Sequence, residues 1–159
     1  MPISQAEKRQ RGNDFQDEVR RSWSLIPATW RMRITDTGAG SRPADELVLT
    51  TPRNFLIEMK RTLKPIFGFG NLRENQATGL NAFDMALPGN CSLIFWSIQN
   101  EDQDEAYAFR FADFCSLCLR TGKLSATLYE LQTYLQYAAL PRITVNGKPG
   151  YDLRGVLKL

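Results

Sequence analysis

The side chains best suited to chemistry in this sequence are two carboxylates and one amine on neighbouring segments. Residues 54–61 alternate in polarity as a β-strand does, so Glu58 and Lys60 project from one face, about 7 Å apart. Asp45 opens the preceding strand, and a hairpin through residues 51–53 places it beside Glu58. The strand's other face is apolar and includes Phe55, Ile57 and Met59.

Two carboxylates that converge at a sheet end form a site for a hard divalent cation such as Mg²⁺. Lys60 beside such an ion positions or helps to activate a water, or steadies the charge that builds on an attacked phosphate. The alternative is an ordinary cross-strand pair of Glu58 and Lys60 on an exposed sheet face, worth less than about 1 kcal/mol.

Histidine is absent from the sequence, which excludes the Ser-His-Asp triad, the Cys-His pair and every zinc site that needs histidine. Three cysteines are too few for a disulfide scaffold. Cys115 and Cys118 have C-x-x-C spacing but lie in an apolar stretch, so we expect core residues rather than redox or metal chemistry there. Catalysis must therefore depend on carboxylates, amines, hydroxyls, thiols or a bound metal.

A helix predicted over residues 14–25, after an Asn13 cap, carries an apolar stripe and two polar residues beside it. At about 100° per residue, Gln16 lies roughly 65° and Glu18 roughly 95° from the stripe centre, on opposite flanks. Either side chain can reach the carboxylates. The stripe consists of Phe15, Val19, Trp23 and Ile26.

A second helix, predicted over residues 71–87, places Gln76 on its apolar stripe between Leu72 and Leu80. A buried amide needs hydrogen-bond partners, and the carboxylates or a metal-bound water would supply them. A glutamine satisfied for purely structural reasons is the alternative. The glycine-rich loop before Asp45 carries Ser41 and Arg42 and allows close approach to a phosphate backbone.

The 159 residues, with 43% hydrophobic and 11% aromatic content, suit a single domain with a real core. The expected order of elements is α-β-β-β-α-β-β-α-α, an α/β fold with a mixed central β-sheet flanked by helices. An irregular aromatic loop is expected at 65–70 and an irregular tail from Pro141. The remaining elements are strands at 30–36, 45–50, 91–98 and 106–111 and helices at 112–121 and 125–138.

Positive charge is concentrated in the first part of the chain. Residues 1–64 hold twelve Lys and Arg against eight Asp and Glu, whereas residues 65–159 hold eight against nine. A basic region with a carboxylate cluster fits an anionic polymer as partner. No apolar run approaches the roughly 20 residues that span a bilayer, and no signal peptide is apparent, so we expect a cytoplasmic protein without membrane contact.

The order of these features resembles the PD-(D/E)xK nuclease superfamily and, within it, the Holliday-junction resolvases of phages and archaea. The likeness covers about residues 11–98. It implies one nuclease domain over 1–159, with a restriction-endonuclease-like core at about 11–111 and a C-terminal helical extension at about 112–159. The core follows the order α-β-β-β-α-β, and an extra strand and helices come after it. The motifs are Gly12-x-x-Phe15, the loop from Gly38 to Asp45, Glu58-x-Lys60 and Gln76 on the next helix.

The resemblance implies roles for single residues. Asp45 and Glu58 would be metal ligands, Lys60 the catalytic lysine, Gln76 a supporting residue, and Ser41 a loop residue near the junction phosphate. The family usually carries a glutamate directly after the phenylalanine of its first helix, but here that residue is Gln16. Three interpretations stay open: Glu18 is the third ligand, Gln16 acts through a water, or the substitution weakens activity.

The resemblance further implies Mg²⁺ or Mn²⁺ as cofactor. It also implies a homodimer that holds a four-way DNA junction and nicks two strands of like polarity. If the protein is phage-encoded, the expected location is the host cytoplasm. The aromatic loop at Ile66–Phe69 either forms part of the dimer interface or packs into the core of its own subunit. The alternatives are another superfamily endonuclease that cuts duplex DNA, a catalytically weak junction-binding module, and an unrelated soluble domain. The expected DNA contacts are Arg11, Ser41, Arg42, Arg61 and Lys64, with Lys8, Arg9, Arg20 and Arg21 as further candidates.

Overall fold

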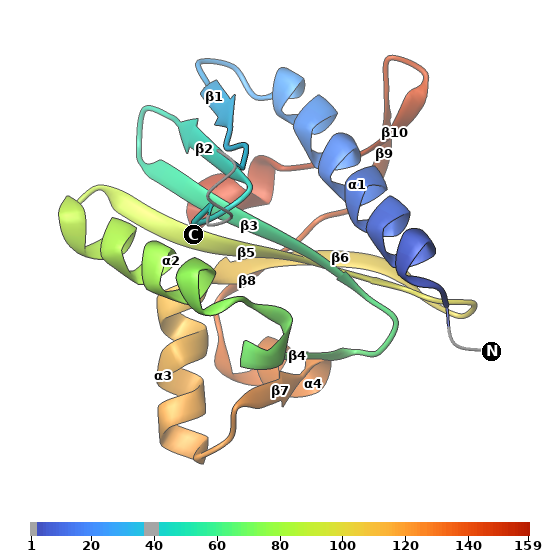
Figure 1. Cartoon of the computed structure of the whole chain (residues 1–159). Helices are drawn as coiled ribbons and strands as arrows, with labels where there is room; N and C mark the ends of the chain where they lie inside the picture. The colour runs from blue at the N-terminus through green and yellow to red at the C-terminus, as the bar shows by residue number, and fades with distance from the viewer. Residues whose placement is uncertain (1–2, 37–41) are drawn as a thin grey trace.

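The computed structural model describes residues 3–36 and 42–159 and contains a six-stranded sheet at its centre (Figure 1). The strand order is β1-β2-β3-β5-β6-β8. Only β3 and β5 run parallel, and every other neighbouring pair in the sheet is antiparallel. The expected mixed central sheet is confirmed. Its strands are β1 (Trp30–Arg33), β2 (Glu46–Leu49), β3 (Asn54–Thr62), β5 (Asn90–Gln99), β6 (Asp104–Arg110) and β8 (Tyr137–Ala139).

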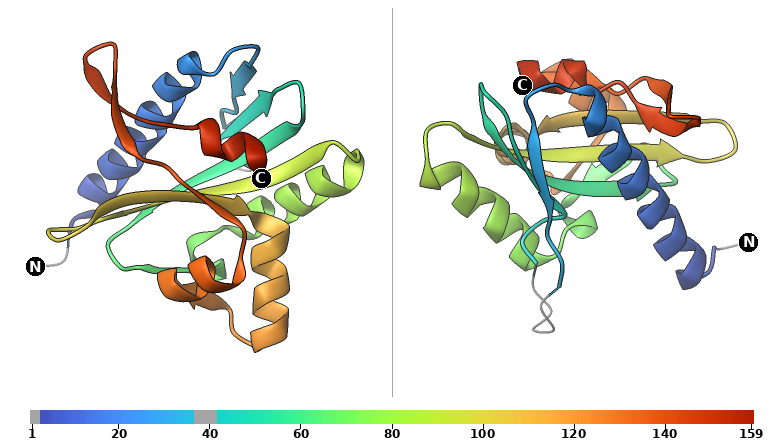
Figure 2. Two further views of the ribbon diagram at one scale, coloured as in Figure 1. Left: turned by 180° about the vertical axis from the view of Figure 1, so that it is seen from behind. Right: turned by 90° about the horizontal axis from the view of Figure 1, so that it is seen from above.

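Helices cover both faces of this sheet (Figure 2). Strand β5 is buried from Cys91 to Ile98, as expected of a mostly apolar strand whose two faces are both covered. On one face, helix α1 (Gln5–Ser22) packs Phe15 and Val19 against Ile57 and Phe95. The other face is covered by α2 (Glu74–Ala86), α3 (Phe111–Thr121) and α4 (Leu128–Tyr134).

Helix α1 begins earlier than expected, at a capping box rather than after Asn13. Ser4 Oγ accepts from the backbone N–H of Glu7, whose side chain accepts from the backbone N–H of Ser4. The apolar stripe predicted for this helix is confirmed as core. The chain then continues through a short 3₁₀ helix, η1 (Trp23–Leu25).

The aromatic segment expected as an irregular loop forms a short strand and a 3₁₀ turn. Strand β4 (Ile66–Gly68) pairs antiparallel with β7 (Ser125–Thr127), and η2 (Phe69–Asn71) follows β4. Phe67 is fully buried between the rings of Trp96, Phe109 and Phe114. Phe67 is therefore core, and it is unavailable as interface material.

The C-terminal region is less helical than expected. The helix predicted over 125–138 is replaced by β7, the shorter α4 and β8, which extends the central sheet beside β6. The tail forms a hairpin of β9 (Arg142–Val145) and β10 (Lys148–Tyr151), followed by η3 (Arg154–Lys158). Asn146 and Gly147 both have positive φ, as a two-residue hairpin turn requires. The division of the chain near residue 111 stays a prediction.

The cysteines behave as core residues. All three are free thiols, Cys91 and Cys118 are buried, and burial raises the pKa of the half-buried Cys115 to about 11. Along the described part of the chain, no helix has the length and apolar character needed to cross a bilayer. The cytoplasmic location stays a prediction.

Candidate active site

The predicted meeting of Asp45 and Glu58 is present in the structure. Glu46 pairs with Ile57 across β2 and β3, so the next position along each strand brings Asp45 beside Glu58. The backbone N–H of Asp45 donates to the Ile57 carbonyl at 2.9 Å, and the backbone N–H of Met59 donates to Asp45 Oδ2 at 2.8 Å. The Ile57 carbonyl therefore holds the backbone of Asp45, and the Met59 N–H holds its carboxylate.

Helix α2 holds the segment that leads to Asp45. Gly79 faces Pro43 so closely that a Cβ on the glycine would overlap the proline ring and lie 3.1 Å from its Cα. Asn75 Nδ2 donates to the Arg42 carbonyl at 2.7 Å, and Ala44 is fully buried. These contacts set the distance between α2 and the strand that carries Asp45.

Glu58, Lys60 and Gln76 form a closed triangle of contacts between β3 and α2. Lys60 Nζ and Gln76 Nε2 each lie 2.7 Å from Glu58 Oε1, and Lys60 Nζ also donates to Gln76 Oε1 at 3.2 Å. Gln76 Oε1 accepts in addition from the backbone N–H of Arg73 at 2.9 Å. The buried amide expected on this helix is therefore bonded to the carboxylate cluster.

The contribution from helix α1 is Gln16. Its Nε2 donates to Asp45 Oδ1 at 3.1 Å, while its Oε1 accepts from Arg20 at 3.0 Å. Arg42 makes an ion pair with the same Asp45 oxygen at 2.8 Å. The site thus contains two carboxylates, two cations and two glutamine amides.

Both carboxylates are buried, and each is 1% exposed. Burial, and next the charge of Asp45, raises the pKa of Glu58 to about 7, and the Lys60 and Arg42 cations oppose this shift. Glu58 Oε2 has no hydrogen-bond partner among the described residues. A buried acceptor without a partner is costly, so this oxygen is the clearest position for an external ligand.

The donor set suits a hard divalent cation. Mg²⁺ commonly takes one or two carboxylates and completes its coordination with water and phosphate oxygens. Asp45 and Glu58 supply two carboxylates, and the unpartnered Glu58 oxygen is available for coordination. Within residues 3–36 and 42–159, no group of three or more acidic, cysteine or histidine side chains is arranged to hold a metal.

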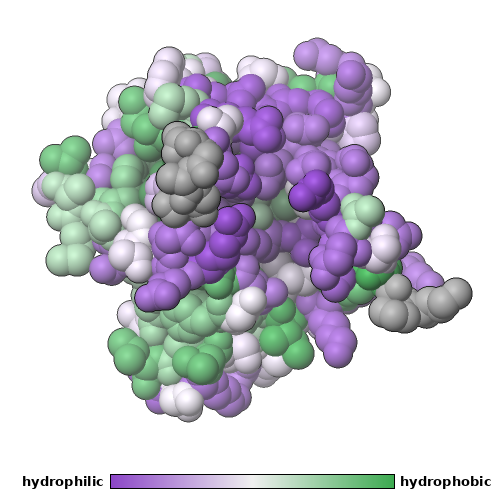
Figure 3. Space-filling model, viewed as in Figure 1, coloured by the Kyte–Doolittle hydropathy of each residue, from purple (hydrophilic) through white to green (hydrophobic). Residues whose placement is uncertain are grey.

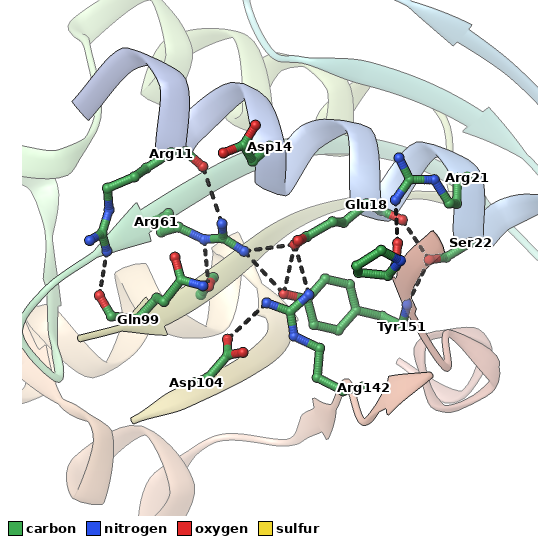
Figure 4. A network of polar contacts seen from close by, with 12 residues as sticks. Arg11, Asp14, Glu18, Arg21, Ser22, Arg61, Gln99, Asp104, Arg142 and Tyr151 are labelled. Carbon is green, nitrogen blue, oxygen red and sulfur yellow. Dashed lines mark hydrogen bonds and ion pairs between the residues drawn. The ribbon is translucent and has the colours of Figure 1, made fainter. Parts of the chain in front are cut away.

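The hypothesis that Glu18 is the third metal ligand is wrong. Figure 4 shows the Glu18 carboxylate directed toward Arg61, Arg142 and Tyr151 instead. Its Oε2 lies 2.7 Å from Arg61, 3.0 Å from Arg142 and 3.2 Å from the Tyr151 hydroxyl. Gln16 and Glu18 lie on opposite flanks of the helix, and the flank of Gln16 meets Asp45.

Arg61 is also misassigned as a DNA contact. It lies on the same face of β3 as Met59, opposite Lys60, and its side chain is 2% exposed. It donates to Ser97 Oγ at 3.0 Å and to the Tyr151 hydroxyl at 3.2 Å, and its guanidinium lies 5.1 Å from the Phe15 ring centre. Arg61 is therefore a structural cation of the core.

The other expected DNA contacts differ in their surroundings. Arg42 is in the site, Lys64 is exposed, and the Arg11 guanidinium donates to the Gln99 carbonyl. Lys64 and Arg11 line a surface hollow of about 710 Å³ beside β4. Ser41 lies outside the described residues. Hydrophilic side chains cover the middle of the face in Figure 3, and apolar ones gather at its left and lower margins.

A second ionic group next to the site was missed by sequence reasoning. Glu46 is fully buried, with Oε1 2.9 Å from Arg31 and Oε2 3.7 Å from Arg20. Burial raises the pKa of Glu46. Arg20 also bonds Gln16, so this group orients the amide that faces Asp45. The spacing of four residues between Gln16 and Arg20 on a helix was an available signal.

Comparison with known proteins identifies the fold. No protein-family model and no curated protein sequence matches the chain. Among solved structures, the chain is similar to Hjc of Archaeoglobus fulgidus, a Holliday junction resolvase from an archaeal hyperthermophile, with a TM-score of 0.53 and 15% sequence identity. The match covers 80% of this chain and 94% of Hjc. The chain therefore has the restriction-endonuclease-like fold expected from its sequence.

Proposed function

We propose that this protein is a metal-dependent endodeoxyribonuclease that resolves four-way DNA junctions by nicking two strands of like polarity. The observation that carries the proposal is the meeting of Asp45, Glu58 and Lys60 at one point of a resolvase-like sheet. The unpartnered oxygen of Glu58 supports a ligand at that point. The basic charge of residues 1–64 supports an anionic partner.

Asp45 and Glu58 would hold one Mg²⁺ or Mn²⁺ ion in this proposal. When bound, such an ion supplies Lewis-acid stabilisation of phosphoryl charge and a nucleophilic hydroxide at neutral pH. The protein's own contribution is orientation. Gln16 and the Met59 N–H fix the Asp45 carboxylate, and Gln76 fixes that of Glu58.

Lys60 has one proton left for the substrate. An ammonium group has three donors, and two of them bond Glu58 Oε1 and Gln76 Oε1. The side chain is 23% exposed, so the third donor has access to a DNA phosphate. A positive charge held there stabilises the negative charge that develops on the attacked phosphoryl group.

A junction-binding module with weak or no cleavage is the second candidate. The observation that favours it is the neutral amide of Gln16, which approaches Asp45 without adding a third carboxylate. A homodimer belongs to both candidates, because a four-way junction has two strands of like polarity to engage. Light scattering of the purified protein tests that assembly.

The deciding experiment compares a synthetic four-way junction with a linear duplex of the same arm sequence, in Mg²⁺, Mn²⁺ and Ca²⁺. We expect paired nicks in the junction, little cleavage of the duplex, and loss of nicking with retained junction binding in Asp45→Asn and Lys60→Ala. Lys158→Ala is the matched control, because Lys158 is exposed in η3.

Undiminished nicking by Asp45→Asn and Lys60→Ala in Mg²⁺ would overturn the site. Equal cleavage of the duplex would identify a less selective nuclease. A junction that shifts on a native gel but stays intact with every ion would favour the non-cleaving module.

A further inference from the structure

The Asp45 carboxylate forms an ion pair with Arg42. Arg42 Nη2 lies 2.8 Å from Asp45 Oδ1, and the Arg42 side chain is 16% exposed. The second contact of this guanidinium is a long one, from Nη1 to the Ile34 carbonyl at 3.4 Å. Arg42 Nε has no partner among the described residues. Asp45 is therefore the strongest partner that the described structure gives Arg42.

Lys60, the other cation of the site, is held differently. Its Nζ contacts Glu58 Oε1 at 2.7 Å and Gln76 Oε1 at 3.2 Å, and Gln76 is itself fixed by the Arg73 N–H. Two acceptors from two elements keep Lys60 in place. Arg42 has one strong acceptor, so it is the cation that can leave without breaking a network.

Arg42 and a divalent cation compete for the same carboxylate. Asp45 Oδ1 already accepts from Gln16 and forms an ion pair with Arg42, and Oδ2 accepts from the Met59 N–H. An ion bound to Asp45 would stand beside the guanidinium, and in a buried site this repulsion is weakly screened. The positive charge must move away or acquire an anion.

We infer that Arg42 is a displaceable counter-ion, paired with Asp45 in the metal-free protein and with a DNA phosphate once a divalent cation occupies the site. This inference rests on the proposed function. The planar guanidinium suits the transfer because it binds phosphate through two parallel hydrogen bonds. Metal binding and DNA binding are then coupled, and each strengthens the other by the same factor.

The first test measures metal binding without DNA. Mn²⁺ is titrated calorimetrically into the wild type, Arg42→Ala, Arg42→Lys and the control Arg120→Ala, which removes an exposed arginine from the last turn of α3. We expect Arg42→Ala to bind Mn²⁺ about 10-fold more tightly than the wild type, a typical size for such coupling. Arg42→Lys should lie between them and Arg120→Ala should match the wild type.

The second test measures DNA binding without turnover. The affinity for a labelled four-way junction is determined by fluorescence anisotropy in Ca²⁺ and in EDTA. We expect Ca²⁺ to strengthen binding by the wild type and by Arg120→Ala, and to strengthen binding by Arg42→Ala several-fold less. Opposite effects of one substitution on metal affinity and on DNA coupling distinguish exchange of partners from a simple loss of positive charge.

Thermal unfolding of each variant shows whether it is folded, and Arg42→Lys replaces Arg42→Ala if the alanine variant is not. Equal Mn²⁺ affinities in the wild type and a folded Arg42 variant would overturn the inference and leave the proposed function standing. Failure of every variant, including the wild type, to bind Mn²⁺ would overturn the metal site and the inference together.

Discussion

The two faces of strand β3 carry similar groups of charged and polar side chains. The groups differ in whether, in the described part of the chain, a buried glutamate oxygen is left without a hydrogen-bond partner. On one face, Glu18 Oε2 accepts hydrogen bonds from Arg61 and the Tyr151 hydroxyl and forms an ion pair with Arg142. On the other face, the buried Glu58 Oε2 accepts from no described residue, although Lys60 and Gln76 bond its neighbouring oxygen. Among the described residues, the buried atom without a partner in the Glu18 network is a donor, Arg142 Nε, whereas at Glu58 it is a carboxylate oxygen, the kind of atom that binds a cation.

The Glu18 network joins elements that are far apart in the sequence. It connects α1, β3 and the C-terminal hairpin, and Arg142 stacks 4.6 Å from the Tyr151 ring centre (Figure 4). The Tyr151 N–H also donates to Ser22 Oγ at 2.7 Å. The network fixes α1 on the sheet, and α1 carries the Gln16 that meets Asp45. The Glu18 network on one face of β3 therefore helps to position Gln16, which contacts Asp45 in the candidate site.

The largest expected effect is on catalysis, from Glu58→Gln. The substitution keeps the shape of the side chain but removes a proposed metal ligand, so we expect at least about a 1,000-fold loss of junction cleavage, or about 4 kcal/mol. Single-turnover cleavage measures it. Because the pKa of Glu58 is raised, the folded protein disfavours the charged carboxylate, so a neutral amide there should not lower the free energy of unfolding near pH 8. A stable variant that cleaves normally would contradict the site.

The next largest effect is on stability, from Glu18→Gln. It leaves the 2% exposed Arg61 without its carboxylate, so we expect a loss of about 3 kcal/mol in the free energy of unfolding. Urea denaturation measures this loss. Below the unfolding transition, cleavage should be reduced far less than in Glu58→Gln. An equal loss of cleavage in a fully folded Glu18→Gln protein would show that the two faces are not functionally distinct.

Local sequence patterns predicted the face of β3 that carries Glu58 better than the face that carries Arg61. Alternation along β3 and one hairpin suffice to join Asp45, Glu58 and Lys60, and helical periodicity identified Gln76. The choice between Gln16 and Glu18 depends on how α1 lies on the sheet, which no local pattern specifies. The same alternation that grouped Glu58 with Lys60 already placed Arg61 on the opposite face, so its burial was predictable from the sequence.

Two elements carried signals that the sequence analysis left unused. The Ser4 and Glu7 pair is a capping-box pattern, and it moves the start of α1 forward from residue 14 to Gln5. Asn146-Gly147 is a strong hairpin-turn signal in the tail. By contrast, β4 and β7 pair over almost sixty residues, and strands of three residues leave no periodicity from which to predict that pairing.

A smaller effect on both stability and activity is expected from Gly79→Ala. The added methyl group would overlap Pro43, so α2 or the segment before Asp45 must shift. We expect a loss of about 2 kcal/mol in the free energy of unfolding, typical of overpacking, and about 10-fold slower cleavage. Thr78→Ala is the matched control, because it alters the neighbouring, exposed position of the same helix. Unchanged cleavage by Gly79→Ala would show that Asp45 tolerates displacement.

The smallest and most local effect is a difference in pKa between two glutamates, Glu58 and Glu130. Each of them lies at the same distance from a lysine. Glu58 lies 2.7 Å from Lys60, and the partly exposed Glu130 lies 2.7 Å from Lys123. Burial raises the pKa of Glu58 to about 7, whereas the hydrogen bond from Lys123 lowers the pKa of Glu130 to about 2, from an ordinary 4.5 in both cases. Carbon-13 NMR titration of the glutamate carboxyl groups measures both values.

The two shifts act on stability in opposite directions. The folded protein retains the Glu58 proton that the unfolded chain loses, so the contribution of Glu58 to stability falls as pH rises from about 4.5 to 7. The contribution of Glu130 is present above about 4.5 and is lost as pH falls toward 2. Glu58→Gln and Glu130→Gln should flatten these two pH windows separately. Added Mg²⁺ should lower the pKa of Glu58 and leave that of Glu130 unchanged, because only a carboxylate that binds the ion loses its proton to it.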